Sequence, residues 1–156
     1  MRIPALVCAM LYLVVTTKAV HAQQLADLQY ISIVIGDLSS ETERVGLTKQ
    51  SLTDTVRVGL KRDAPKLLID STPPVSVLYV KITSVGDGTA SFISVSVVRP
   101  GEVRGDNGGK VYSGPVTVWH RGYLLTGPTA TMASQIRDSI NEGVTDFAAQ
   151  YYKDNP

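Results

Sequence analysis

The sequence predicts an α+β fold, a two-layer sandwich in the order β-α-β-β-β-α, with an antiparallel meander and two helices packed on one face of the sheet. Three observations predict it. Several segments alternate apolar and polar residues, as strands with one buried face do. Two longer segments repeat apolar residues at steps of three and four, as helices with one buried face do. A Gly-Asp-Gly turn at 86–88 joins two alternating segments into a hairpin.

The first strand is expected over residues 28–35, where isoleucine recurs at every second position. The polar stretch 36–46 is interpreted as a connection. Thr48 is a typical N-cap residue, and a helix follows it. This helix ends near 62–63, because Pro65 disfavours helical backbone at the residue before it. Its apolar stripe is formed by Leu52, Val56 and Leu60.

A short strand at 67–69 precedes the hairpin, whose strands cover 75–85 and 90–99. The stretch 100–110 is rich in glycine and is expected to be a flexible loop.

The next strand covers 111–120, with Val116 and Val118 facing inward. Proline cannot donate to a strand ladder, so the Gly114-Pro115 pair indicates an edge or bulged strand.

The last helix is expected from Thr131 to about Tyr152, after Gly127-Pro128 ends the sheet region. Its apolar stripe is the strongest helical pattern in the chain. The stripe consists of Met132, Ile136, Ile140, Val144, Phe147 and Tyr151. Its polar side is interpreted as solvated and consists of Arg137, Asp138, Ser139, Asn141, Glu142 and Asp146.

The N-terminal segment 1–22 has the features of a cleaved signal peptide. Arg2 supplies the positive charge, residues 5–15 are apolar, and Val20-His21-Ala22 offers small residues at the two positions that a signal peptidase reads. The apolar run is shorter than the about 20 residues of a membrane span. We therefore expect cleavage after Ala22 and export of a single domain, residues 23–156, to the periplasm or the medium of a bacterium.

The composition excludes several kinds of site from the exported part. The only cysteine, Cys8, lies inside the expected signal peptide, and no small residue precedes it as lipidation would require. Disulfides, thiolate chemistry and cysteine-based metal sites are therefore excluded. The 15 basic residues fall to 13 without Arg2 and Lys18, against 14 acidic ones. Because these charges are balanced and scattered, we expect neither nucleic acid nor anionic lipid as the main partner, and no cofactor.

Six residues are candidates for an interaction surface: Tyr79, Lys81, Phe92, Trp119, Arg121 and Tyr123. The first three, together with Trp119, are expected on the face of the sheet that no helix covers. The segment 119–123 also concentrates the side-chain types that dominate binding hot spots. In the alternative interpretation, Trp119 and Tyr123 cover the end of the sheet while Arg121 extends to water.

Three other patterns have a simpler structural interpretation. His120 is the only histidine after residue 22, and its sequence neighbours include neither an obvious nucleophile nor a carboxylate. The acidic residues Asp37, Glu41 and Glu43 offer oxygen ligands to Ca²⁺, but they lack the EF-hand spacing and are interpreted as part of a solvated loop. Arg104-Gly105-Asp106 spells an adhesion tripeptide, which a turn-forming composition also produces. We expect no metal site.

A set of short motifs runs along the chain. They are Gly46-Leu47-Thr48 at a helix start, Leu78-Tyr79-Val80 and Ser94-Val95-Ser96-Val97 in strands, and Ile136-Arg137-Asp138-Ser139 in a last helix that leads to Asn155-Pro156. Together they resemble an uncharacterised family of small exported bacterial proteins, over nearly all of residues 23–156. One departure is the segment 63–66, Asp-Ala-Pro-Lys, where the family has an Ala-Gly turn. The resemblance implies the same α+β domain and brings no activity with it.

We therefore expect an exported, non-enzymatic domain that folds on its own and binds another envelope protein or a second copy of itself. The first alternative is binding of a small molecule or glycan at Trp119, Arg121 and Tyr123. The second is a hydrolase that uses His120 with carboxylates such as Glu43.

Overall fold

A computed structural model describes residues 25–69, 76–104 and 111–156, and it confirms the α+β class. The strands are β1 (Tyr30–Ile35), β2 (Leu68–Ile69), β3 (Val77–Val85), β4 (Ala90–Arg104) and β5 (Val111–Thr126). The helices are α1 (Ser40–Arg44), α2 (Lys49–Asp63) and α3 (Thr129–Asp154). The expected signal peptide and its cleavage at Ala22 lie outside the described residues, so both stay predictions.

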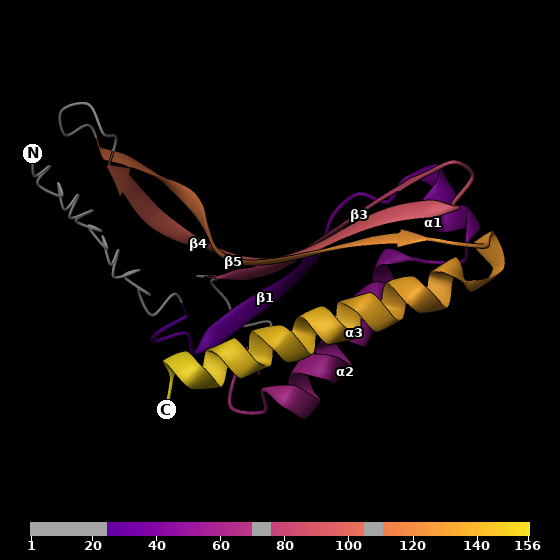
Figure 1. Ribbon diagram of the computed structural model, residues 1–156. Helices are drawn as coiled ribbons and strands as arrows, with labels where there is room; N and C mark the ends of the chain where they lie inside the picture. The colour runs from indigo at the N-terminus through magenta and orange to yellow at the C-terminus, as the bar shows by residue number, and fades with distance from the viewer. Residues whose placement is uncertain (1–24, 70–75, 105–110) are drawn as a thin grey trace, which may run out of the picture.

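The five strands form one sheet in the order β2-β1-β3-β4-β5. Strands β3, β4 and β5 pair antiparallel, which confirms the meander, whereas β1 pairs parallel with both β2 and β3. Helices α2 and α3 lie against one face of this mixed sheet (Figure 1). None of the described helices is long and apolar enough to cross a membrane.

The core lies between the sheet and these two helices. Alternate residues of β3 and β4 form its sheet side, each at most 2% exposed: Leu78, Val80, Ile82, Ile93, Val95 and Val97. The two expected helical stripes form its other side and are entirely buried. The strand period of 2 and the helix period of 3.6 thus meet in one apolar layer.

Helix α2 begins and ends where the sequence predicts. Thr48 is its N-cap, and a capping box with Ser51 satisfies two backbone N–H groups. At Gly59 a Cβ would lie only 3.0 Å from Val144 Cγ1, so the glycine permits the close approach of α2 to α3. Beyond it, Thr145 Oγ1 of α3 donates to Asp63 Oδ2 at 2.7 Å.

Two N-terminal expectations are corrected. The stretch 36–46 is not wholly irregular, because it contains α1, whose N-cap Ser39 accepts a hydrogen bond from the Thr42 N–H. Strand β1 begins at Tyr30 rather than at residue 28. The chain before it is held by the end of α3, where Asp154 Oδ2 accepts from the Leu25 N–H at 3.0 Å.

Strands β4 and β5 continue beyond the rest of the sheet as a two-stranded ribbon, here named the arm (residues 99–104 and 111–116). The expectation of a loop over 100–110 is therefore wrong for 100–104, whereas 105–110 lie outside the described residues. Pairing of β3 with β4 stops at Val98, and no other strand of residues 25–69, 76–104 and 111–156 pairs with the arm. In Figure 1 the arm curves away from α2 and α3.

The arm tolerates residues that usually end strands. Pro100 lies opposite Pro115, and Gly101 lies opposite Gly114. Neither proline can donate a backbone hydrogen bond. In the described part of the chain no further strand lies beside the arm, so no acceptor on a neighbouring strand is left without its donor. The pairing of Pro-Gly with Gly-Pro explains both why the strands persist and why the sequence pattern resembles a loop.

Strand β5 is the edge strand that Gly114-Pro115 indicated, and it runs past residue 120 to Thr126. Its pairing shifts from Val97 with Trp119 to Val98 with Thr117, which leaves Val118 as an extra residue in a β-bulge. The bulge exchanges the two faces of the strand. Trp119 therefore faces the helices and is 8% exposed, whereas Val116 and Val118, expected inward, are only half-buried.

Candidate functional site

The face of the sheet opposite α2 and α3, here named the open face, holds most of the exposed large apolar side chains. Six of the eight in the described part of the chain lie on it: Tyr30, Val34, Leu68, Val85, Phe92 and Leu124. The other two are Val111 on the arm and Val58 on α2. Phe92 is 46% exposed and Leu124 76%. Tyr30 lies opposite Leu68, and Phe92 lies opposite Leu124, so the apolar residues include two neighbouring pairs, and adjoining exposed apolar side chains are a feature of contact surfaces.

The strand register arranges the centre of the open face in three rows across β3, β4 and β5. They are Thr83-Phe92-Leu124, Lys81-Ser94-Gly122 and Tyr79-Ser96-His120. Directly opposed side chains have Cβ atoms about 5 Å apart, so each row is a set of contacting neighbours. The middle row is small or polar and lies between an apolar row and a row that contains two rings.

The rings of Phe92 and His120 meet over Gly122. A Cβ at this position would lie 3.3 Å from Phe92 Cζ and 3.4 Å from His120 Cε1, so only glycine leaves room for both side chains as they stand. His120 Nε2 lies 3.1 Å from Ser94 Oγ, a hydrogen bond whose direction depends on the imidazole tautomer. The imidazole therefore leans over Ser94 in the middle row.

Tyr79 and Lys81 lie on the open face as the sequence predicts. Tyr79 is half-buried, because its ring crosses Gly36, where a Cβ would lie 2.7 Å from Tyr79 Oη. Lys81 is exposed, and no carboxylate of the described residues lies within ion-pair distance of it. All five strands together contain one carboxylate, Glu102 of the arm.

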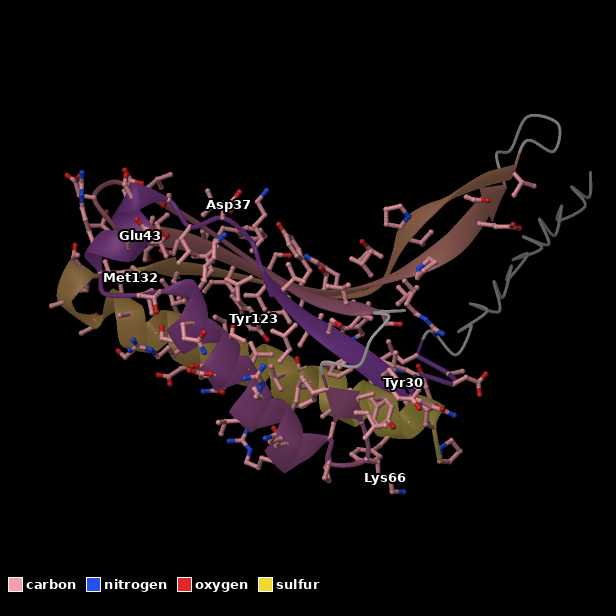
Figure 2. All side chains as sticks on the ribbon, turned by 180° about the vertical axis from the view of Figure 1, so that it is seen from behind. Tyr30, Asp37, Glu43, Lys66, Tyr123 and Met132 are labelled. Carbon is pink, nitrogen blue, oxygen red and sulfur yellow. The ribbon has the colours of Figure 1, made fainter. Side chains whose placement is uncertain are left out.

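Trp119, Arg121 and Tyr123 lie on the covered side of the sheet, so the structure separates them from the other three candidates. The Trp119 ring packs edge-on against Phe147, with centroids 5.6 Å apart. Arg121 Nε lies 3.1 Å from Asp146 Oδ2 of α3. Figure 2 shows Tyr123 between the sheet and α3. The expected place of Trp119 on the uncovered face is therefore wrong, and these contacts match the alternative in which the aromatic rings cover the sheet.

The environment of Tyr123 is low in solvent and negative. Burial, followed by the carboxylates of Glu142 and Asp146, raises the pKa of the Tyr123 hydroxyl. This hydroxyl makes no hydrogen bond to the described residues. The Tyr123 ring is therefore part of the packing between β5 and α3.

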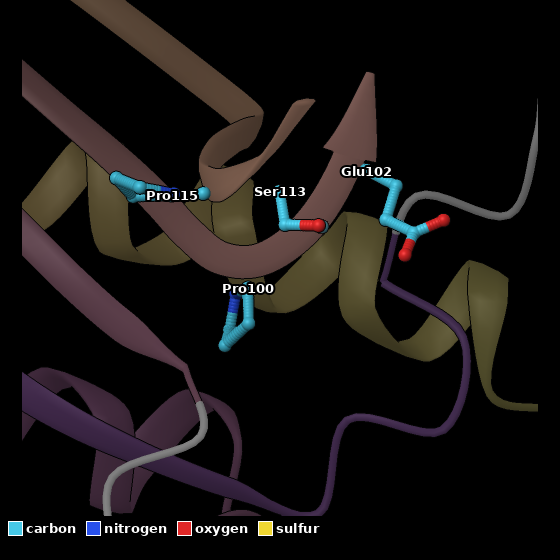
Figure 3. Close-up of a pocket in the computed structure, with 6 residues that line it drawn as sticks. Pro100, Glu102, Ser113 and Pro115 are labelled. Carbon is cyan, nitrogen blue, oxygen red and sulfur yellow. The ribbon is translucent and has the colours of Figure 1, made fainter. Parts of the chain in front are cut away.

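A shallow hollow of about 600 Å³ lies at the bend of the arm (Figure 3). It is lined by Pro100, Gly101, Glu102, Ser113, Gly114 and Pro115. The alternation of β4 from Phe92 onward puts Pro100 and Glu102 on the open-face side. Residues that line the hollow thus lie on the same side of β4 as the open face, farther along the strand.

The acidic residues of the N-terminal half are used in local structure. Lys49 Nζ donates to Asp37 Oδ1 at 2.6 Å, and this hydrogen bond lowers the pKa of Asp37. Glu41 and Glu43 lie in the first turn of α1, where the helix dipole favours negative charge. The described residues include no group of three His, Cys, Asp or Glu that could hold a metal ion. Gly105 and Asp106 of the adhesion tripeptide lie outside the described residues.

Three buried hydroxyls, which the sequence pattern did not reveal, form a hydrogen-bonded chain between α1 and the β3–β4 hairpin. Thr42 Oγ1 lies 2.8 Å from Ser84 Oγ, which in turn lies 2.8 Å from Ser91 Oγ. All three residues are buried. The hydroxyls satisfy one another, and no histidine or carboxylate in the described part of the chain is hydrogen-bonded to them. Their arrangement therefore holds α1 to the β3–β4 hairpin and does not form a nucleophile–base pair.

Neither a protein-family model nor a curated protein matches the chain. A solved structure described as an uncharacterized protein is similar at 13% identity and a TM-score of 0.42, over 78% of this chain and 89% of that chain. A minor lipoprotein from Acinetobacter baumannii is similar at 15% identity and a TM-score of 0.35, over 83% of this chain and 95% of that chain. The resemblance of the sequence motifs to an exported bacterial family stays a prediction.

Sequence reasoning identified three residues of the open face and missed the others. Val34, Ser94, Gly122 and Leu124 belong to the same surface, and His120 was considered only for catalysis. The period-2 alternation of β4 and β5 carries the signal that could have found them, once the bulge at Val118 is allowed for.

Proposed function

We propose that this chain is an exported, non-enzymatic binding domain whose open face docks onto another protein of the bacterial envelope. The signal-peptide pattern of residues 1–22 supports export. The arrangement of the sheet supports binding, because one face stabilises the fold while the other presents apolar side chains to solvent.

One observation carries the proposal: six exposed large apolar residues share the face that α2 and α3 leave bare. Water contact with this area is unfavourable at roughly 25 cal/mol per Å², and a partner would remove it. Unpaired backbone on the arm, where two strands stand without a third, adds a place for a partner strand.

The geometry gives less support to the two alternatives. Trp119, Arg121 and Tyr123 contact other parts of the same molecule: Trp119 packs on Phe147, Arg121 pairs with Asp146, and Tyr123 lies between the sheet and α3. A Ser-His hydrolase also needs a carboxylate that orients the imidazole and an enclosed site for its substrate. His120 Nε2 lies 3.1 Å from Ser94 Oγ, but no carboxylate of the described residues is hydrogen-bonded to this imidazole, and the pair lies on an open surface. Both observations favour the binding domain.

Site-specific photo-cross-linking in the producing cell tests the proposal. A photoreactive phenylalanine analogue replaces Leu124 on the open face or, as the matched control, Val58 on α2, which is similarly exposed at 65%. We expect discrete protein adducts from position 124 and none of the same size from position 58. Equal adducts from both positions, or adducts from position 58 alone, would contradict the open face as the docking surface.

A further inference from the structure

We propose that the open face binds an acidic, extended segment of the partner protein, with a partner carboxylate seated between Lys81 and His120 at Ser94. This inference rests on the proposed function, and it specifies the chemistry of the partner. It follows from the donors on this face, from their apolar neighbours and from the charge of the surface.

Three polar side chains meet in the middle of the open face. Ser94 lies directly opposite Lys81 in the register, and its Oγ is 3.1 Å from His120 Nε2. An ammonium on β3 therefore lies opposite a hydroxyl on β4, and the imidazole of β5 reaches the same hydroxyl diagonally from the neighbouring row. With the imidazole donating to Ser94 Oγ, the Ser94 hydroxyl and the Lys81 ammonium are left as donors to a carboxylate, and hydrogen bonds to a charged acceptor are the stronger ones.

An apolar contact lies one row away from these donors. Phe92 and Leu124 are opposed in the register and are two residues along their strands from Ser94 and Gly122. Two residues of an extended strand span about 6.6 Å, which is also the spacing between the two rows along the strands. An extended segment that lies on the open face parallel to the strands therefore places its side chains i and i+2 over neighbouring rows. An acidic residue at i and an apolar residue at i+2 fit the two rows together.

The charge of the face selects an acidic partner over a second copy of this chain. Lys81 has no ion-pair partner in the described part of the chain, and the strands contribute no carboxylate to the centre of the face. Two copies packed with the centres of their open faces together would bring the two Lys81 ammonium groups into a region to which the strands contribute no carboxylate. Like charges in such a contact oppose association, whereas a partner carboxylate compensates the charge.

The same logic gives the partner segment a direction. Glu102, the one carboxylate of the strands, lies on the open-face side in the hollow of the arm, and Lys81 and His120 lie on the body. A segment with its acidic residue over the body and a basic or neutral residue over the arm matches both ends. The reverse orientation places like charges together at each end.

An NMR titration of the ¹⁵N-labelled chain tests the inference. The probe is a nine-residue peptide with valine, glutamate and valine at alternate positions and threonine between them, and its matched control has glutamine in place of glutamate. We expect the amide shifts of Ser94, His120 and Gly122 to move, with the glutamate peptide binding at least about fivefold more tightly. K81M should weaken the glutamate peptide at least about threefold, and K61M, which removes an exposed lysine of α2, should leave its affinity unchanged.

Each other outcome overturns the inference. Equal affinities for the two peptides, shifts confined to the helices or the arm, or no shift at 10 mM peptide would exclude a carboxylate site at Ser94. Binding to vesicles of phosphatidylglycerol that K81M abolishes, without binding of the glutamate peptide, would assign the site to a membrane surface. The proposed function survives these results as long as position 124 still cross-links a protein, so the two failures are distinguishable.

Discussion

The two faces of the sheet are built from the same strands, but one packs against helices and the other contacts solvent. On the covered face, Val95 and Val97 of β4 are fully buried against α3. On the open face of the same strand, Phe92 contacts solvent and Ser94 bonds to His120. Because side chains alternate along a strand, one strand can stabilise the fold on one side and present a binding surface on the other. Under the proposed function, the residues that stabilise the fold and the residues that bind the partner are therefore different ones and can be substituted separately.

The largest expected difference lies between a core aromatic residue and an exposed leucine. Phe147→Ala removes a buried ring that contacts Trp119 and Tyr151, and it should lower the free energy of unfolding by about 3–5 kcal/mol. Leu124→Ala on the open face should change it by less than about 0.5 kcal/mol. Urea unfolding of both variants measures this. A comparable loss in the two variants would show that the open face is part of the stabilising core.

Alanine substitutions of Gly143 and Gly122 test the same difference between the covered face and the open face. A Cβ at Gly143 would lie 3.0 Å from Val95 Cγ2 in the packed core, whereas a Cβ at Gly122 would meet the mobile end of Phe92. Overpacking lowers the free energy of unfolding by about 1–3 kcal/mol, whereas the higher helix propensity of alanine raises it by about 1 kcal/mol. Gly143→Ala should therefore lower the free energy of unfolding by about 1 kcal/mol net. Gly122→Ala should be nearly neutral. Thermal unfolding of the two variants compares them, and a larger loss at Gly122 would reverse the assignment of the faces.

The contact between α2 and α3 predicts an acid-sensitive part of the stability. Hydrogen bonds from Arg62 and Thr145 lower the pKa of Asp63 to about 2. A carboxylate whose pKa is lowered in the folded state stabilises the fold at pH values above its ordinary pKa near 4. This stabilisation is lost as the pH falls toward 2. Partial exposure screens the effect, so Asp63→Asn should destabilise by about 1 kcal/mol at pH 6 and by almost nothing at pH 2. Unfolding at both pH values measures it, and an equal loss at the two would show that Asp63 acts through packing alone.

The smallest free energies are expected on the arm. Amides of residues 101–104 should exchange with solvent through openings of about 0–2 kcal/mol, because two strands without a third or a covering helix are marginally stable. Amides of residues 93–95, between two strands and under α3, should exchange only through global unfolding. Hydrogen exchange resolved by residue measures both sets. Protection of the arm equal to that of the core would show that the arm is an integral part of the sheet.

The covered face was predictable from the sequence, because burial imposes strict periods. The stripe of α3 is buried at every expected position, and the alternation of β3 and β4 assigns the sheet side of the core correctly. The Thr48 cap and the stop before Pro65 gave the bounds of α2, since local chemistry determines both.

The candidate surface was predictable only in part, because local pattern does not record pairing. The bulge at Val118 reverses which face each β5 side chain takes, so Trp119 was placed on the wrong side. The arm was interpreted as a loop, since proline and glycine argue against a strand until it is known that no third strand lies beside them. Helix α1 has five residues, too few to show a periodic stripe.

The measurement that tests the central claim most directly is the capture of the cross-linked partner by a double variant of the open face. Phe92→Ser combined with Leu124→Ser removes the apolar row, and Val58→Ser on α2 is its control. The account predicts at least about tenfold less bound partner for the double variant, with a free energy of unfolding within about 1 kcal/mol of the parent, and no change for the control. Full capture by a folded double variant would show that the open face is not where the partner binds.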